Sequence, residues 1–155
     1  MTASDRWKDE LASAISQTLI ALRPVFREDA VAMLALDCHP WNGGLYLAIL
    51  KRSEVVADPE LADPAEMAAW ELYDCGASLA EWAPVADLAL QMRADYSSAA
   101  EPSTVADTYL RACAIALQQQ SVARAIRTFE LAEQFRCSVA HPDDGREYCH
   151  LPLVE

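Results

Sequence analysis

The sequence has few of the features that mark the common ligand-binding and catalytic classes. Only 4 of its 155 residues are glycine, and it contains no Gly-x-x-x-x-Gly-Lys loop, no Gly-x-Ser-x-Gly elbow and no His-Glu-x-x-His pair. We therefore expect no nucleotide and no other cofactor. The apolar runs are too short to cross a membrane, and 155 residues suffice for one core. A single domain over residues 1–155 is the expectation.

Basic residues are also scarce. The chain has 12 Lys and Arg against 24 Asp and Glu, which gives a net charge of −12. Nucleic-acid binding needs clustered Lys and Arg to neutralise phosphates. An anionic membrane surface attracts the same residue types. The composition therefore argues against both kinds of partner, whereas a basic protein remains compatible with it.

The shortage of positive charge is complete between Arg52 and Arg93, where no Lys or Arg occurs. This interval predicts a negative face that steers a cationic protein towards it. A solvated surface that only keeps the chain soluble is the alternative. Trp41, in a preceding loop, is either an interface anchor or a side chain folded back over a sheet edge. The predicted partner-binding residues are Trp41, Asp58, Glu60, Asp63 and Glu66.

Cysteine occurs five times, an odd number, and never as Cys-x-x-Cys. The spacing therefore signals neither a zinc knuckle nor a thioredoxin-type redox site. No secretory leader pattern precedes the first amphipathic segment. Reduced thiols in a cytoplasmic protein are the simplest interpretation. The five positions are Cys38, Cys75, Cys113, Cys137 and Cys149.

Helical periodicity is clearest at the N-terminus. Apolar residues three and four apart predict a helix from Asp5 to Arg23, which the following proline ends. A second helix is predicted to start near Pro84, since proline costs no backbone hydrogen bond in a first turn. A third begins near Ser103. The apolar phase shifts at residues 118–121, where either the helix breaks or its buried face broadens.

Strand patterns occupy the segments between these helices. Residues 30–38 and 45–51 are apolar runs around an Asn-Gly-Gly turn and predict a hairpin. Their continuous apolar character indicates strands covered on both faces. Residues 67–75 fit a short helix or, preferably, a third strand, and residues 135–151 fit a closing hairpin around Pro-Asp-Asp-Gly. The expected fold is α+β, with about four or five antiparallel strands and helices packed on one face.

Reactive side chains gather at the expected ends of the two hairpins. If the hairpins were neighbours, Cys38, His39 and His141 could supply the nucleophile and base of a small hydrolase. Cys38, His141 and His150 could instead bind zinc. However, the spacing matches no zinc signature, and adjacent strand residues point to opposite faces. The favoured hypothesis therefore has neither a catalytic residue nor a metal.

Three segments carry a resemblance: the Asp-Cys-His-Pro-Trp-Asn-Gly-Gly loop, the Trp70–Tyr73 segment and the His-Pro-Asp-Asp-Gly turn. With its size and acidity, the chain resembles small bacterial proteins of unknown function that are grouped with polymorphic-toxin immunity proteins. The resemblance implies a non-enzymatic module that holds a basic protein as an immunity protein holds a toxin. It assigns no site residue. A Cys/His hydrolase or metal-binding enzyme is the alternative, and a self-associating domain without a ligand is the third hypothesis.

Overall fold

The computed structural model describes residues 4–149 of the chain. Four short 3-10 helices occur within this range: η1 (Arg23–Phe26), η2 (Pro59–Ala62), η3 (Pro64–Ala69) and η4 (Ala80–Trp82). The remaining elements are α1 (Asp5–Leu22), β1 (Val31–His39), β2 (Gly44–Lys51), α2 (Arg52–Ala57), α3 (Val85–Ser98), α4 (Pro102–Leu117), α5 (Gln120–Ile126) and β3 (Leu131–Ser138).

The first helix has the bounds that its periodicity predicts. The hydroxyl of Ser4 caps α1 by accepting the amide hydrogen of Trp7 at 3.1 Å. The helix ends at Leu22, because Pro24 falls in the first turn of η1. Its buried side packs against α4 and α5 and includes the fully enclosed Leu11 and Ile15. The Asp5–Arg23 prediction is confirmed to within one residue.

The structure also decides where the helix near Pro84 starts and whether the helix breaks at residues 118–121. Helix α3 starts at Val85 with Pro84 as its N-cap, directly after η4, as the proline argument requires. The phase shift at 118–121 marks a true break: Gln119 has extended backbone angles and separates α4 from α5. The amide side chain of Gln119 then donates to Asp9 of α1 at 3.1 Å, which ties the break to the first helix.

Within residues 4–149 the sheet has three strands, in the order β2-β1-β3. Strands β1 and β2 form the predicted antiparallel hairpin, with Leu36 opposite Leu47. Strand β3, however, lies parallel to β1, with Leu34 opposite Cys137. The α+β class is thus correct, whereas the expected antiparallel sheet of four or five strands is wrong. The long return through α3, α4 and α5 brings the chain back beside the start of β1, where a strand can only enter in parallel.

The two missing strands have local causes. Residues 67–75 begin inside η3 and afterwards form only an isolated bridge, Leu72 with Ile49, before a turn in which Asp74 has a positive φ of 55°. In the closing segment the predicted turn is present, since the amide of Gly145 donates to the carbonyl of His141 at 2.8 Å. Its second arm contributes a single bridge, and residues 150 and 151 of the predicted hairpin lie outside the described residues.

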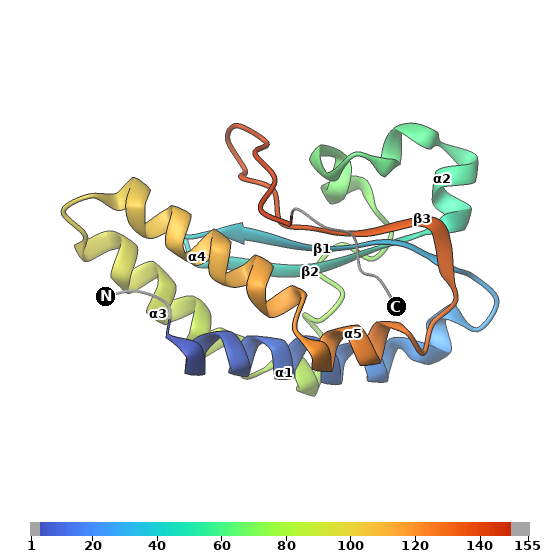
Figure 1. Cartoon of the computed structure of the whole chain (residues 1–155), viewed down its shortest axis with the longest axis horizontal. Helices are drawn as coiled ribbons and strands as arrows, with labels where there is room; N and C mark the ends of the chain where they lie inside the picture. Colours follow the sequence, from blue (N-terminus) through green and yellow to red (C-terminus); the bar gives the residue numbers. More distant parts are fainter. Residues whose placement is uncertain (1–3, 150–155) are drawn as a thin grey trace.

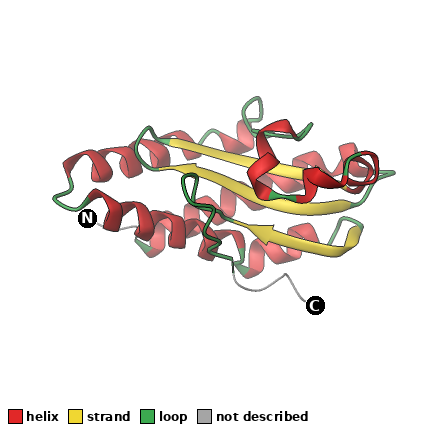
Figure 2. Ribbon diagram, turned by 90° about the horizontal axis from the view of Figure 1, so that it is seen from above, coloured by secondary structure: helices red, strands yellow, loops and turns green. Residues whose placement is uncertain are grey.

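Both faces of the sheet are covered. Helices α1, α3, α4 and α5 lie on one side, as Figure 1 shows. The opposite side carries residues 52–75, here called the cover segment, which Figure 2 shows lying over the strands. Alternate residues of β1 and β2 pack on each side, so that Met33 and Leu50 meet Met67 and Trp70 of the cover segment. This arrangement confirms the two-sided burial indicated by the continuous apolar runs. The expectation of helices on one face holds only for the long ones.

No helix within residues 4–149 has both the length and the apolar character that a membrane crossing requires.

Candidate functional site

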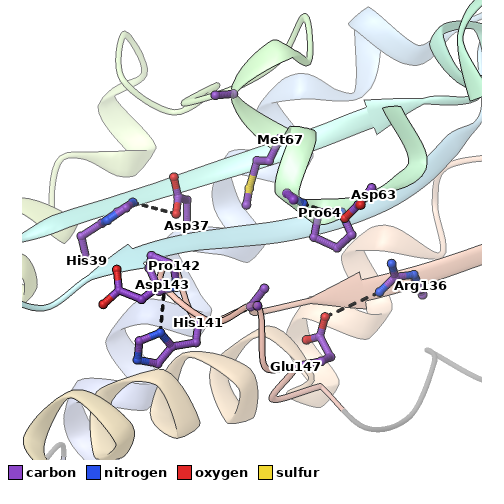
Figure 3. Close-up of a pocket in the computed structure, with 14 residues that line it drawn as sticks. Asp37, His39, Asp63, Pro64, Met67, Arg136, His141, Pro142, Asp143 and Glu147 are labelled. Atoms are coloured by element: carbon purple, nitrogen blue, oxygen red, sulfur yellow. Dashed lines mark hydrogen bonds and ion pairs between the residues drawn. The ribbon is translucent and has the colours of Figure 1, made fainter. Parts of the chain in front are cut away.

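A hollow lies on the cover-segment side of the sheet, between η3 and the turn at residues 140–147. This sheet cleft has a volume of about 550 Å³. Figure 3 shows side chains of β1, β3, η3 and the turn pointing into it. Asp37 and His39 reach it because they alternate along β1 with Leu36 and Cys38, which face the helices.

Asp37 and His39 form a bonded pair in the floor of the sheet cleft. His39 Nε2 lies 2.8 Å from one oxygen of Asp37, and the Tyr73 hydroxyl donates to the other at 2.6 Å. Burial alone would raise the pKa of Asp37, but the hydrogen bonds from His39 and Tyr73 outweigh it and lower that pKa below its ordinary value. The same hydrogen bond raises the pKa of His39, against the opposing effect of its own burial. The pair therefore favours a charged carboxylate beside a readily protonated imidazole.

The C-terminal turn places His141 on the far side of the same cleft. Its Nδ1 accepts the amide hydrogen of Asp143 at 3.1 Å. Asp144 approaches the same atom at 3.8 Å. The structure thus brings His39 and His141 to one cleft, which is the convergence considered from the sequence.

Glu147 is a cleft residue that sequence reasoning missed. Its carboxylate accepts the amide hydrogens of Val139 at 2.7 Å and Cys149 at 3.0 Å, together with the hydroxyl of Ser138. Arg136 lies 3.6 Å from it, as the dashed line in Figure 3 marks. The carboxylate fixes the turn to β3. No spacing signal in the sequence distinguishes it from the other acidic residues.

Cys38 does not share this site. It points into the helical side of the sheet, is fully buried, and its Sγ lies 3.5 Å from the sulfur of Met92. The neighbouring Cys113 and burial raise the pKa of the Cys38 thiol well above its ordinary value, which suppresses the nucleophilic thiolate. Of the alternative site residues, His39 and His141 meet, Cys38 is excluded, and His150 lies outside the described residues. Within residues 4–149, no three His, Cys, Asp or Glu side chains are grouped to hold a metal ion.

The four predicted partner-binding carboxylates all lie exposed on the cover segment. Asp58 and Asp63 also cap η2 and η3, by accepting the amide hydrogens of Glu60 at 3.2 Å and Ala65 at 2.9 Å. None of the four forms an ion pair with a residue in the described part of the chain, 4–149. We call Asp58, Glu60, Asp63 and Glu66 the acidic surface. Asp63 belongs to it and to the rim of the sheet cleft.

Other acidic residues of the cation-free interval do not join this surface. Glu54 accepts the amide hydrogens of Lys51 and Glu71, and therefore serves the start of α2. Glu71 lies 3.4 Å from the ammonium of Lys51. Glu81 and Asp87 are placed in η4 and α3, in the helical layer. The expectation of one negative face over the whole interval is therefore wrong, because Glu81 and Asp87 lie on the other side of the sheet from the cover segment.

Trp41 is separated from the acidic surface. It lies in the hairpin turn, whereas the cover segment begins at the opposite ends of the same strands. The indole is half-buried and meets His39 and Tyr96 edge-on, with ring centroids 5.4 and 6.5 Å apart. Trp41 therefore packs in the hairpin turn, away from the cover segment, and its role in partner binding stays a prediction.

Comparison with protein-family models, with curated proteins and with solved structures found no match to this chain.

Proposed function

We propose that this protein is a non-enzymatic binding module that holds a basic protein through its acidic surface, as an immunity protein does. The observation that carries the proposal is the exposure of four carboxylates on one short segment without a counter-ion among the described residues. A folded domain of net charge −12 gains solubility from any acidic residue. The location of these four carboxylates on one segment, the cover segment, is what favours a binding partner over solubility alone.

The energetics favour steering and selection over raw affinity. An exposed ion pair contributes only about 0.2–1 kcal/mol, so four of them supply roughly 1–4 kcal/mol and leave most of the affinity to apolar contacts. Charges that act within the screening length of about 8 Å at physiological salt accelerate the encounter with a cationic surface. We therefore expect association that weakens strongly as salt is added.

The sheet cleft supports the proposal by its position. Asp63 links its rim to the acidic surface, and Met67 and Pro64 give its wall an apolar lining. A lysine or arginine side chain has an apolar stem and a charged head. Such a side chain, bound at Asp63, would have room to continue towards Asp143 on the opposite wall.

The alternative of a Cys/His hydrolase lacks support of this kind. Its nucleophile and its base point to opposite faces of β1, since Cys38 is enclosed against the helices and His39 faces the sheet cleft. We do not propose it.

The test is capture of basic proteins by the immobilised chain from an extract of its source cells. The test variant is Glu60→Lys/Glu66→Lys, because neither side chain caps a helix, whereas Asp58 and Asp63 do. We expect salt-sensitive capture of proteins of high isoelectric point, reduced at least about tenfold by the double reversal.

The matched control is Glu81→Lys/Asp87→Lys, which reverses two charges of the same interval in the helical layer. This variant has the same net charge as the test variant, and we expect it to capture as the unmodified chain does. An equal loss of capture in both variants would show that net charge alone causes the binding, and would contradict a specific role of the acidic surface. Capture of neutral or acidic proteins only would refute the proposed function.

A further inference from the structure

A second groove lies far from the sheet cleft, where α1 runs into η1 beside the connection from α5 to β3. Its volume is about 490 Å³. The two segments that form it come together at the end of α1, as Figure 1 shows. The residues that line it are Ile20, Arg23, Pro24, Phe26, Arg27, Thr128, Phe129 and Glu130. We call it the arginine groove.

Its charge has the opposite sign to that of the whole molecule. Arg23 and Arg27 are both exposed at the groove. The one acidic residue in the lining, Glu130, lies 3.1 Å from the guanidinium of Arg52 and is thereby compensated. Glu28 is the exposed acidic neighbour in sequence. Screening over about 8 Å makes these local charges count more than the distant negative ones.

The groove also has an apolar base. Phe26 and Phe129 are buried beneath it, with their rings edge-to-face and their centroids 5.3 Å apart. Ile20 keeps 49% of its surface exposed at the rim, and Val25 beside the groove keeps 47%. Exposed aliphatic side chains next to two guanidinium groups form a mixed surface, apolar in its base and cationic at its edge.

We propose that the arginine groove docks an acidic protein segment that carries an apolar side chain. Carboxylates of the segment pair with Arg23 and Arg27, since a planar guanidinium can donate two parallel hydrogen bonds to one carboxylate. The apolar side chain covers Ile20 and the aromatic base. This docking site is independent of the acidic surface and gives the module a second partner-facing side.

The charge pattern decides between an acidic segment and other anions. Two arginines are too few for a nucleic-acid backbone, which requires a run of phosphate contacts. An anionic membrane needs a broad basic patch, and the chain as a whole is repelled from it. A short segment with two to four carboxylates can pair with both arginines of the groove.

The test uses a fluorescein-labelled pentapeptide, Glu-Glu-Leu-Glu-Glu, titrated with the full chain by fluorescence anisotropy. Two reference peptides replace either the four glutamates with glutamine or the leucine with glycine. We expect salt-dependent binding of the first peptide, and at least about tenfold weaker binding of either reference. The variant Arg23→Gln/Arg27→Gln should lose at least about tenfold in affinity for the first peptide.

Two matched variants make the result specific. Arg124→Gln removes an exposed arginine of α5 outside the groove lining, and Glu60→Lys/Glu66→Lys alters only the acidic surface. Arg124→Gln should bind the peptide as the unmodified chain does, and the second variant should keep its dependence on Arg23 and Arg27. Thermal melting confirms that each variant is folded. Absence of binding by the unmodified chain, equal affinity in the Arg23→Gln/Arg27→Gln variant, or binding to anionic phosphatidylserine vesicles without binding to the peptide would each overturn the proposal.

Discussion

Replacing Trp70 with alanine tests how the cover segment is held on the sheet. The Trp70 side chain is 3% exposed, packs with Met33, Leu50 and Met67, and its indole N–H donates to the carbonyl of Leu61 at 2.8 Å. Truncating a buried tryptophan costs about 3–5 kcal/mol. Trp70→Phe keeps most of the contact and loses the hydrogen bond, for a cost of about 1–2 kcal/mol.

Urea unfolding followed by circular dichroism gives the change in the free energy of unfolding, and amide hydrogen exchange locates it. In Trp70→Ala we expect fast exchange in η2 and η3, while the amides of α4 keep their protection. Trp41→Ala is the matched control, because this half-buried tryptophan lies in the hairpin turn and packs against His39 and Tyr96 instead. A loss below about 1 kcal/mol with η3 still protected would show that the segment has another anchor.

Three further predictions concern packing, thiol reactivity and protonation. Gly76→Ala should destabilise the fold by about 1–3 kcal/mol in urea unfolding, because its new Cβ would lie 2.5 Å from the buried ring of Trp82. Iodoacetamide at about pH 8 should modify Cys75 before any other thiol, yet slowly, since burial raises the pKa of Cys75 to about 12. The imidazole of His39 should titrate above its ordinary pKa of 6.5 in a proton NMR titration, and Asp37→Asn should bring it back down.

A specific result would contradict each of these three predictions. Gly145→Ala has open space around its new Cβ, so it should cost only the strain of a positive φ, and a larger loss than for Gly76→Ala would contradict the packing argument. Rapid labelling of Cys38 in the folded chain would contradict its placement in the core. A His39 pKa that is unchanged by Asp37→Asn would contradict the bonded pair.

The Asp37–His39 pair also predicts how stability depends on pH. Because the pKa of His39 is raised, its contribution is fully present below its ordinary pKa of 6.5 and is lost as pH rises through the folded value. Because the pKa of Asp37 is lowered in the folded chain, the contribution of Asp37 to stability is fully present above its ordinary pKa of 3.8. This contribution is lost as pH falls through the pKa of Asp37 in the folded chain. The pair therefore stabilises the fold most between these limits, and Asp37→Asn should flatten the decline in stability as pH rises above the ordinary His39 pKa of 6.5. An equal decline in both proteins would contradict this assignment.

The sequence predicted correctly those elements whose formation depends on residues close together in the chain. The periodicity before Pro24, the proline at position 84 and the Asn42–Gly44 turn specified α1, the start of α3 and the β1–β2 hairpin. The alternation of side chains along a strand likewise predicts that Cys38 and His39 face opposite sides of β1. These features depend on neighbours a few residues apart, which the sequence displays directly.

The remaining features depend on contacts between distant segments. The parallel pairing of β3 with β1 requires α3, α4 and α5 to return the chain to the start of β1, and no pattern within β3 reveals it. Residues 67–75 have strand-forming side chains, yet the Asp63 cap and Pro64 set a 3-10 helix first. The sequence likewise shows that the cation-free interval is acidic. It does not show that the interval divides between the two faces of the sheet, with Trp70 holding its first part on one face and Met92 of α3 packed on the other.

We propose that the acidic surface, and no other acidic part of the molecule, meets a cationic partner. The most direct test is a titration of the isotope-labelled chain with octalysine, followed by amide chemical shifts at low and at physiological salt. We predict that the largest shifts fall at residues 57–67, extend to the rim of the sheet cleft, and shrink as salt is added. Shifts of equal size along η4 and α3, where Glu81 and Asp87 lie, would contradict the claim.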